Sequence, residues 1–337
     1  MTEHVWDTDD LEHLDDCVVC GSGVLVPLYE DLRAHDPTGW RLDRCGACGS
    51  ALLNPRPTVG AIGKAYRGPY RPYKKRRPRP VPKGARAKLR RAATDAYLRR
   101  RWGYASLTAP AALLPLAAVR PGLRRAADRL VRFVPAHEEP GARLLDIGCG
   151  SGTYLKLMRD LGWQVHGVEL DAGAVRAARE AGLDVRQGTM EDLDAAVDGV
   201  FDVITIGHVI EHTHDPIAAL KAAWRVLKPH GFLWIGTPNL GSLGARLFRA
   251  NWRALEPPRH LVLFTGRALT DALHRVGFRD VRVVRSTASA PWHFQQSARL
   301  AGIGPLRLAR GLGRLVNAAS YLRPTMADEM TFVATRA

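Results

Sequence analysis

The chain has 337 residues, enough for one large domain and a smaller one. Its residues are 46% hydrophobic and 24% charged, as in soluble globular proteins. The net charge of +16 is unevenly distributed, because residues 67–101 alone carry fifteen Lys or Arg and one acid, a charge of +14. The high charge therefore belongs to one segment and not to the whole surface.

The N-terminal residues exclude a secretory signal peptide. Residues 1–16 contain seven Asp or Glu and no Lys or Arg, whereas a signal peptide needs a basic start and an apolar run. We therefore interpret residues 1–14 as an acidic tail and expect a cytoplasmic protein.

Four of the five cysteines form two pairs with metal-ligand spacing, Cys17 with Cys20 and Cys45 with Cys48. Two C-x2-C pairs are a strong zinc signal in a cytosolic chain, where reducing conditions disfavour disulfides. A glycine follows each pair and lets the loop fold back, so that backbone N–H groups can point at the thiolates. We expect a zinc ribbon at residues 15–57, stabilised by a structural zinc ion.

Residues 58–135 are predicted to be a basic linker followed by helices. The Pro- and Arg-rich stretch 66–82 has linker composition, and the pattern becomes helical at 84–101. An uncharged run at 102–119 has nearly the length of a membrane span, but its prolines argue against one. We expect an interfacial or buried helical hairpin there, and a further helix at about 123–133.

Strands and helices alternate in residues 136–286, which predicts a parallel sheet covered by helices. The fold class is therefore α/β, with a Rossmann-like sheet. A helical insertion follows at 287–327, as a lid or an interface, and residues 328–337 supply the last strand of the same sheet. The predicted strands are 142–147, 164–169, 183–187, 201–207, 231–237, 279–286 and 330–335.

The insertion contains an amphipathic pattern of helical period. The favoured interpretation is a helix that packs its apolar face on the protein, as a lid or simply as core. A dimer face or a membrane-surface contact is the alternative. The apolar residues that share this face are Leu308, Leu312, Leu315, Val316, Ala319 and Leu322.

A glycine-dense turn follows the first predicted strand. Residues 144–152 read Leu-Leu-Asp-Ile-Gly-Cys-Gly-Ser-Gly, a buried strand followed by a tight turn and a helix start that can face a ligand. The G-x-G-x-G spacing, with Thr153 in place of the last glycine, argues against a dinucleotide. Asp146 would repel a pyrophosphate but could pair with an ammonium group, and Glu169 has the usual reach of a ribose acceptor.

This stretch resembles the first motif of class I S-adenosylmethionine-dependent methyltransferases. The resemblance implies a seven-stranded sheet with a reversed last strand, and S-adenosylmethionine as the methyl donor. It also implies that Thr189 and Met190 flank the adenine ring and that His208 lies near the sulfonium. The residues expected to bind the cofactor are Asp146, Gly148, Gly150, Gly152, Glu169, Leu170, Thr189, Met190, Gly207 and His208.

Residues 208–216 resemble the Glu-His-x-x-Asp-Pro segment of small-molecule methyltransferases related to the quinone-biosynthetic enzymes. The resemblance makes His212 a candidate general base, although a structural hydrogen-bonding role is equally compatible with the sequence. His260 lies in a Pro-Arg-His-Leu stretch expected to cover the acceptor, and it is a second candidate. His208, Glu211 and His212 also spell H-x-x-E-H, but that zinc-peptidase motif needs a continuous helix, and here it straddles a strand end and a loop.

The leading hypothesis is an in-line transfer of a methyl group to a small molecule such as a sugar, a lipid or a secondary metabolite. The main alternative is an rRNA or tRNA methyltransferase that binds RNA through the ribbon and the basic segment. A non-catalytic zinc-ribbon adaptor is a third hypothesis, and peripheral membrane contact with a lipid-linked acceptor is a fourth. The sequence identifies neither the acceptor atom nor the oligomeric state.

Overall fold

The computed structural model describes residues 6–33, 38–66, 84–137, 139–284 and 289–337. The predicted linker at 66–82 lies outside these residues except for Tyr66. The chain divides into two compact units, and each is described by itself. The first unit contains residues 1–70, 206–225 and 235–337, and the second contains residues 71–205 and 226–234.

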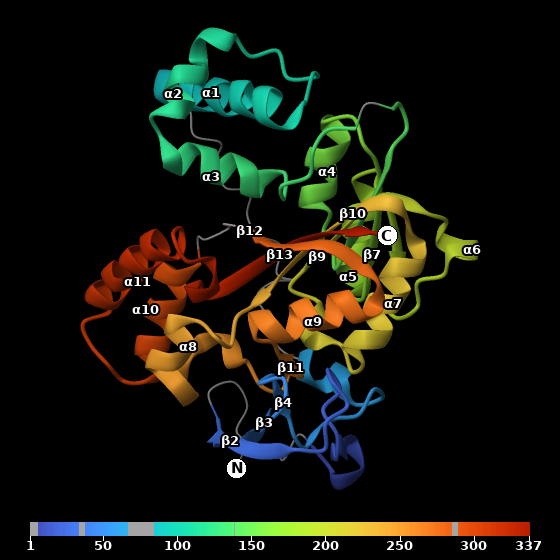
Figure 1. Cartoon of the computed structure of the whole chain (residues 1–337), viewed down its shortest axis with the longest axis vertical. Coiled ribbons are helices and arrows are strands. Elements are labelled where there is room, and N and C mark those ends of the chain that lie inside the picture. Colours follow the sequence, from blue (N-terminus) through green and yellow to red (C-terminus); the bar gives the residue numbers. More distant parts are fainter. Residues whose placement is uncertain (1–5, 34–37, 67–83, 138, 285–288) are drawn as a thin grey trace. The chain divides into compact units, whose positions relative to one another are not determined.

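Three helices at the start of the second unit pack on one another: α1 (Ala85–Trp102), α2 (Leu114–Ala118) and α3 (Pro121–Leu130). Figure 1 shows them in teal. The predicted helix at 84–101 is confirmed by α1. The predicted hairpin at 102–119 is wrong, because the run contains only a 3-10 turn and the five residues of α2. Among the described residues, no helix is long and apolar enough to cross a membrane.

A seven-stranded sheet carries the core of the fold, with the strand order β12-β13-β10-β9-β6-β7-β8. The pairs β6–β7 and β7–β8 are parallel, whereas β12 and β13 are antiparallel, so the predicted reversal of the last strand is confirmed. The fifth of these strands along the chain, β10, begins at Leu227, four residues before the predicted start at 231. The strands are β6 (Arg143–Ile147), β7 (Gln164–Glu169), β8 (Asp184–Gln187), β9 (Phe201–Gly207), β10 (Leu227–Pro238), β12 (Phe278–Val284) and β13 (Glu329–Arg336).

Buried apolar side chains explain why the strands of the second unit form at these positions. Four of the five residues of β6 are buried, as expected for a strand covered on both faces. Leu144 of β6 and Val185 of β8 share one core with Leu155 and Met158 of α4. The helices that follow the strands are α4 (Thr153–Asp160), α5 (Ala172–Glu180), α6 (Ala195–Asp198) and α7 (Pro216–Val226).

The first unit contains a smaller, four-stranded sheet with the order β11-β4-β3-β2. Strands β2 (Leu25–Leu32), β3 (Trp40–Cys45) and β4 (Ala51–Leu53) come from the predicted ribbon. The fourth, β11 (Val262–Leu263), comes from more than 200 residues further along and pairs antiparallel with β4. A separate pair joins β1 (Leu11–Glu12) to β5 (Arg56–Pro57). The ribbon is therefore completed by a strand that its own sequence does not contain.

The predicted insertion folds as two helices, α10 (Ala290–Leu300) and α11 (Leu306–Ser320). Phe294 of α10 and Val316 of α11 are buried together, with Phe248 packed against them. The prediction that the apolar face of α11 packs as core is confirmed for Val316 and wrong for its leucines, because Leu308, Leu312, Leu315 and Leu322 are exposed. Two further helices of this unit are α8 (Leu243–Phe248) and α9 (Gly266–Val276).

Candidate functional site

The glycine turn between β6 and α4 adopts backbone conformations that favour glycine. Gly148, Gly150 and Gly152 have φ angles of 71°, 55° and 77°. A Cβ at Gly152 would lie 2.1 Å from Leu183 Cδ1, so this glycine is needed for packing. A Cβ at Gly150 would meet no atom within 4 Å, so this part of the turn is open. The open backbone next to the start of α4 suits the approach of a ligand.

Glu169, the last residue of β7, braces the turn from the neighbouring strand. One carboxylate oxygen accepts the N–H of Gly150 at 2.8 Å, and the other accepts the N–H of Asp171 at 3.0 Å. Each oxygen keeps a second lone pair, so the side chain can still accept a hydrogen bond from a hydroxyl group. Its predicted contact with a ribose stays a prediction.

Asp146 is buried, and its partner in the structure is Arg132, which the sequence did not indicate. Asp146 Oδ1 accepts from the guanidinium of Arg132 and from the hydroxyl of Thr205, whereas Oδ2 has no hydrogen-bond partner among the described residues. The guanidinium of Arg132 lies 3.8 Å from the ring centre of Tyr154 and 5.0 Å from that of Trp234. Burial raises the pKa of Asp146, and the charge of Arg132 opposes this rise.

The other cofactor residues predicted in this unit differ in exposure. Leu170 is exposed just after β7, whereas Met190 is buried. The N–H and the hydroxyl of Thr189 both donate to Asp192 Oδ2 at 2.8 Å, which lowers the pKa of Asp192. Asp192 therefore holds the loop after β8 in shape.

Gly207 and His208 belong to the first unit, where a polar cluster follows β9. His208 has a φ of 56°, and its Nδ1 lies 3.2 Å from Oε1 of the fully buried Glu211. Thr237 of β10 donates its hydroxyl to the other oxygen of Glu211 at 2.9 Å. Burial alone would raise the pKa of Glu211, but the hydrogen bond and charge of His208, with the charges of His212 and His260, lower it to about 2.

The two predicted bases lie side by side in this cluster, with ring centres 4.8 Å apart. His212 Nδ1 donates to the carbonyl of Arg259 at 2.9 Å, and His260 Nδ1 donates to the carbonyl of Ala254 at 2.7 Å. Carbonyl oxygens only accept, so the Nε2 atom of each neutral ring keeps a free lone pair. Burial, and then the charge of His212, lower the pKa of His260 to about 4.

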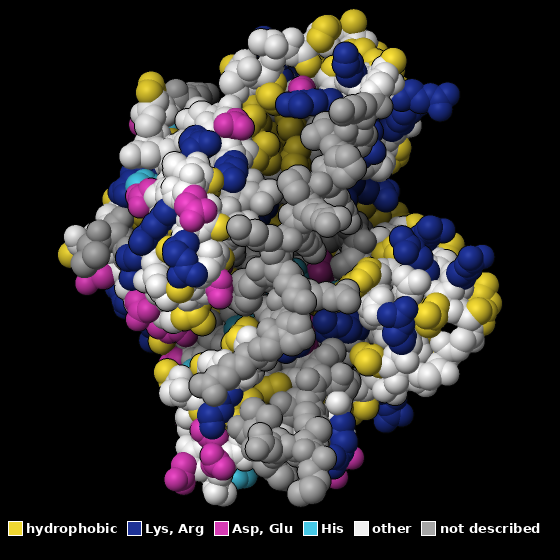
Figure 2. All heavy atoms as spheres, turned by 180° about the vertical axis from the view of Figure 1, so that it is seen from behind, with side chains coloured by type: hydrophobic (Ala, Val, Ile, Leu, Met, Phe, Trp, Pro, Cys, Tyr) yellow, Lys and Arg dark blue, Asp and Glu magenta, His cyan; other side chains and the backbone are white. Residues whose placement is uncertain are grey.

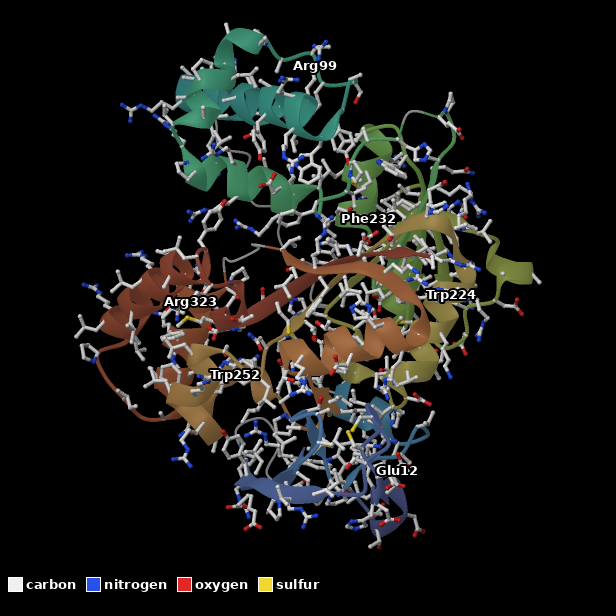
Figure 3. All side chains as sticks on the ribbon, viewed as in Figure 1. Glu12, Arg99, Trp224, Phe232, Trp252 and Arg323 are labelled. Atoms are coloured by element: carbon white, nitrogen blue, oxygen red, sulfur yellow. The ribbon has the colours of Figure 1, made fainter. Side chains whose placement is uncertain are left out.

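Tyr66 and Glu256 are members of the cluster that the sequence did not reveal. The hydroxyl of Tyr66, in a 3-10 helix at Ile62–Tyr66, lies 3.2 Å from His212 Nδ1. Glu256 binds Arg253 and Arg259 through its carboxylate, and it lies on the loop that carries the buried Trp252, labelled in Figure 3. No spacing rule connects these residues to His212, so only the folded chain brings them together.

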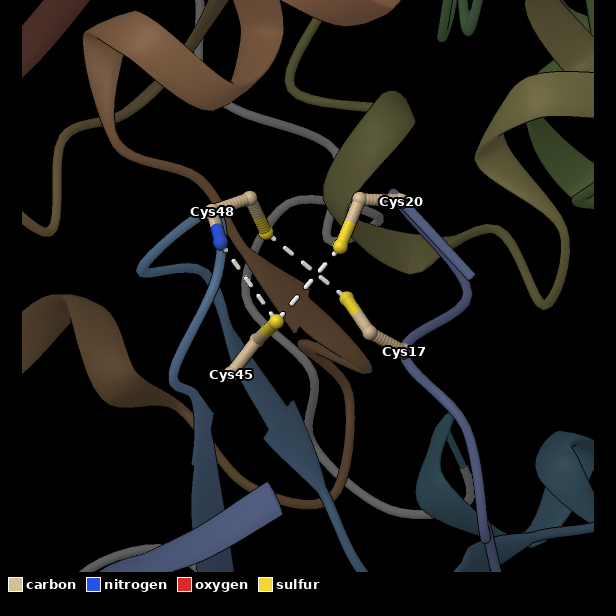
Figure 4. A group of neighbouring side chains, drawn as sticks. All are labelled: Cys17, Cys20, Cys45 and Cys48. Atoms are coloured by element: carbon tan, nitrogen blue, oxygen red, sulfur yellow. Dashed lines mark hydrogen bonds between the residues drawn. The ribbon is translucent and has the colours of Figure 1, made fainter. Parts of the chain in front are cut away.

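Two groups of side chains in the described part of the chain could hold a metal ion. In Figure 4 the thiols of Cys17, Cys20, Cys45 and Cys48 converge, with Cys17 Sγ 3.7 Å from Cys48 Sγ and Cys20 Sγ 3.5 Å from Cys45 Sγ. Tetrahedral zinc thiolates with Zn–S bonds of about 2.3 Å place their sulfur atoms about 3.8 Å apart, so the donor set fits zinc. The second group is Glu211, His212 and His260, whose ligand atoms lie within 4.8 Å of one another.

Two adjacent acids, Asp328 and Glu329, lie near the histidines His208 and His293. His208 Nε2 lies 3.5 Å from Glu329 Oε1, and the same oxygen lies 3.8 Å from His293 Nε2. Asp328, the residue before β13, is buried, and neither carboxylate oxygen has a hydrogen-bond partner among the described residues. Burial raises the pKa of Asp328 to about 7, and the nearby Ser242 only partly offsets this.

Replacing Asp328 with Asn is expected to stabilise the protein above pH 7. The folded-state pKa of Asp328 lies above its unfolded value, so its contribution to stability is complete below pH 4 and is lost as the pH rises to about 7. The variant should gain on the order of 4 kcal/mol at pH 8 relative to the wild type, and little at pH 4. Thermal unfolding at both pH values measures this, with the exposed Asp271→Asn as control. An identical change in stability at both pH values would contradict the raised pKa of Asp328.

Part of the chain is similar to known methyltransferases. The methyltransferase domain family matches residues 119–283. A ubiquinone biosynthesis O-methyltransferase of Xanthomonas campestris pv. campestris is 41% identical over 106 residues, which are 30% of this chain and 44% of that protein. One of Xanthomonas axonopodis pv. citri is 40% identical over 116 residues, 32% of this chain and 48% of that protein. The chain thus spans less than half the length of these relatives.

Among solved structures, an S-adenosylmethionine-dependent methyltransferase from Archaeoglobus fulgidus aligns with a TM-score of 0.43 and 22% identity, over 64% of this chain and 94% of that one. Counted along the chain within the sheet, the strand order found here is 6-7-5-4-1-2-3, and strands 6 and 7 pair antiparallel. The family match and this seven-stranded sheet show that residues 119–283 lie in a methyltransferase domain.

Proposed function

We propose that the chain transfers a methyl group from S-adenosylmethionine to a small-molecule acceptor. The observation that carries this proposal is the left-handed turn at Gly148 to Gly152, which is open at Gly150 and braced by Glu169. The names of the relatives, which are O-methyltransferases of ubiquinone biosynthesis, support a small acceptor of the sugar, lipid or secondary-metabolite type.

The residues of the second unit fit S-adenosylmethionine by their chemistry. Asp146 Oδ2, to which no described residue donates a hydrogen bond, can accept one from the cofactor's ammonium group, and Glu169 can accept from a ribose hydroxyl. The cofactor supplies a methyl group already activated by the positive sulfur. The chain therefore needs to align donor and acceptor, exclude water and, for a hydroxyl acceptor, remove a proton.

We assign proton removal to the histidines around Glu211, with His208 favoured. His212 and His260 keep a free Nε2 lone pair and remain candidates. The side chain of His208 is 51% exposed, and the buried carboxylate of Glu211 accepts a hydrogen bond from its Nδ1. A buried carboxylate that orients a half-exposed imidazole is the arrangement expected of a general base.

We also propose that Cys17, Cys20, Cys45 and Cys48 hold a structural zinc ion. The sulfur spacings match a tetrahedral tetrathiolate site. The tight turns after each pair, with Gly21 and Gly49 at φ angles of 77° and 76°, keep the thiols together.

Calorimetry with S-adenosylmethionine tests the proposed function. We expect the wild type to bind the cofactor and Gly150→Arg to lose at least about a hundredfold in affinity, because the new side chain fills the open part of the turn. The matched control is Gly162→Arg, at another glycine with positive φ and open space in the same unit. If the wild type bound no cofactor, or if both variants bound like the wild type, the proposal would fail.

The acceptor can be sought with a methyl-labelled cofactor and a metabolite extract, with mass spectrometry of the labelled product. Label in a small molecule supports the proposal. Label found only in added RNA would show that the acceptor is RNA and not a small molecule. The position of the label then identifies the acceptor atom as O, N or C.

A further inference from the structure

Helix α11 exposes a row of leucines to solvent. Leu308, Leu312 and Leu315 are 70%, 43% and 69% exposed, and Leu322, just beyond the helix, is 78% exposed. Ile303, in the connection from α10, is 56% exposed. Single exposed leucines are normal on protein surfaces, but a row at helical spacing marks a surface that is covered in the working protein.

The residues of α11 divide its circumference into three faces. At 3.6 residues per turn, the three leucines of the helix lie within about 60° of one another. Gly313, Val316 and Ser320 form the buried face, and a Cβ at Gly313 would lie 2.6 Å from the carbonyl oxygen of Ala290 in α10. One side of the helix therefore packs against α10, and the leucine face takes no part in that contact.

The third face of α11 is basic. Arg307, Arg310 and Arg314 are exposed and lie within about 60° of one another on the side away from the buried face. Residues 289–327 contain five arginines and no Asp or Glu. In Figure 2, hydrophobic and basic side chains lie side by side over the part of the molecule that carries α10 and α11 (right). Arg323, labelled in Figure 3, extends the basic surface beyond the helix.

We propose that the leucine face of α11 binds the surface of an anionic lipid bilayer. A helix with exposed leucines and neighbouring arginines can lie in the interface, with the leucines among the acyl chains and the guanidinium groups at the phosphates. The positive charge requires a partner of opposite sign. A second copy of this chain would present the same arginines, and no Asp or Glu from residues 289–327, so self-association through this face is electrostatically disfavoured.

Co-sedimentation of the full chain with vesicles tests this inference. Vesicles of phosphatidylcholine with 30% phosphatidylglycerol are compared with vesicles of phosphatidylcholine alone. We expect binding to the anionic vesicles that weakens as salt rises, because exposed charges are screened. The double variant Leu308→Ser/Leu315→Ser should lower the partition coefficient at least about tenfold, because two apolar side chains no longer enter the interface.

The matched control is Val24→Ser/Val59→Ser, which removes one exposed apolar side chain from the ribbon and one just after it and should bind like the wild type. The variant Arg310→Gln/Arg314→Gln should bind anionic vesicles less, and its binding should depend less on salt. Light scattering is run in parallel without lipid. Equal vesicle binding by the leucine variant and the wild type would overturn the proposal, as would a wild-type dimer that the leucine variant abolishes. Cofactor binding is measured separately, so the outcome does not depend on the proposed function.

Discussion

Replacing Cys45 with Ser is expected to loosen the histidine cluster as well as the ribbon. A tetrathiolate zinc site contributes on the order of 10 kcal/mol to folding, which exceeds what a small module can supply by burial. Cys45 ends β3, which pairs with β4, and β4 pairs with β11. Hydrogen exchange should therefore rise in residues 253–264 together with residues 40–53, and zinc content measured by mass spectrometry should fall.

The hydrogen bonds that leave the ribbon explain this coupling. The N–H of Leu53 donates to the carbonyl of Leu261, and the N–H of Leu261 donates to the carbonyl of Glu211. The guanidinium of Arg56 donates to the carbonyl of His214 at 2.7 Å, and the hydroxyl of Thr265 donates to the carbonyl of Cys48 at 3.2 Å. The ribbon thus supports both segments that carry the candidate bases.

Two controls make the zinc prediction specific. Cys149→Ser changes the one cysteine outside the cluster and should leave exchange in both segments unchanged. Chelation of the wild-type protein should reproduce the effect of Cys45→Ser, which separates loss of metal from damage caused by the substitution. Faster exchange confined to residues 15–57 would show that the ribbon folds independently of the cluster.

Local patterns were sufficient to predict the large sheet. Each strand is a short apolar run, and the helices between strands end at glycines such as Gly162, Gly182 and Gly277, all with positive φ. Asp215 caps α7 by accepting the N–H groups of Ile217 and Ala218. These features depend on residues close in sequence, so a single sequence reveals them.

The sequence could not reveal contacts made across long separations. Strand β11 has two residues, too few for any periodic signal, and it forms because β4 offers it a free edge. Arg132 follows α3 with an unusual φ of 52°, and nothing near it in sequence indicates that it meets Asp146. For α11 the helical period correctly grouped the leucines, but a period alone does not say whether a face meets protein or solvent.

Replacing Glu211 with Gln is expected to slow methyl transfer by about 100-fold or more while leaving cofactor affinity unchanged. The carboxylate is fully buried and holds His208 on one oxygen and Thr237 on the other. A neutral amide removes the charge that stabilises the protonated imidazole, so the acid limb of the pH–rate profile should move to lower pH. The measurement is the rate with the acceptor found by methyl labelling, together with calorimetry for the cofactor.

Three histidine variants separate a catalytic role of His208 from a structural role of the cluster. If His208 is the base, His208→Asn should lose as much rate as Glu211→Gln, and the double variant should lose no more, because the pair acts as one unit. His260→Asn should instead lower the melting temperature, since His260 is buried and its Nδ1 donates to the carbonyl of Ala254. A larger loss of rate in His212→Asn than in His208→Asn, at unchanged melting temperature, would move the base to His212. Because His212 is anchored to Arg259 beside the strand that completes the ribbon, that result would also make the rate sensitive to the metal.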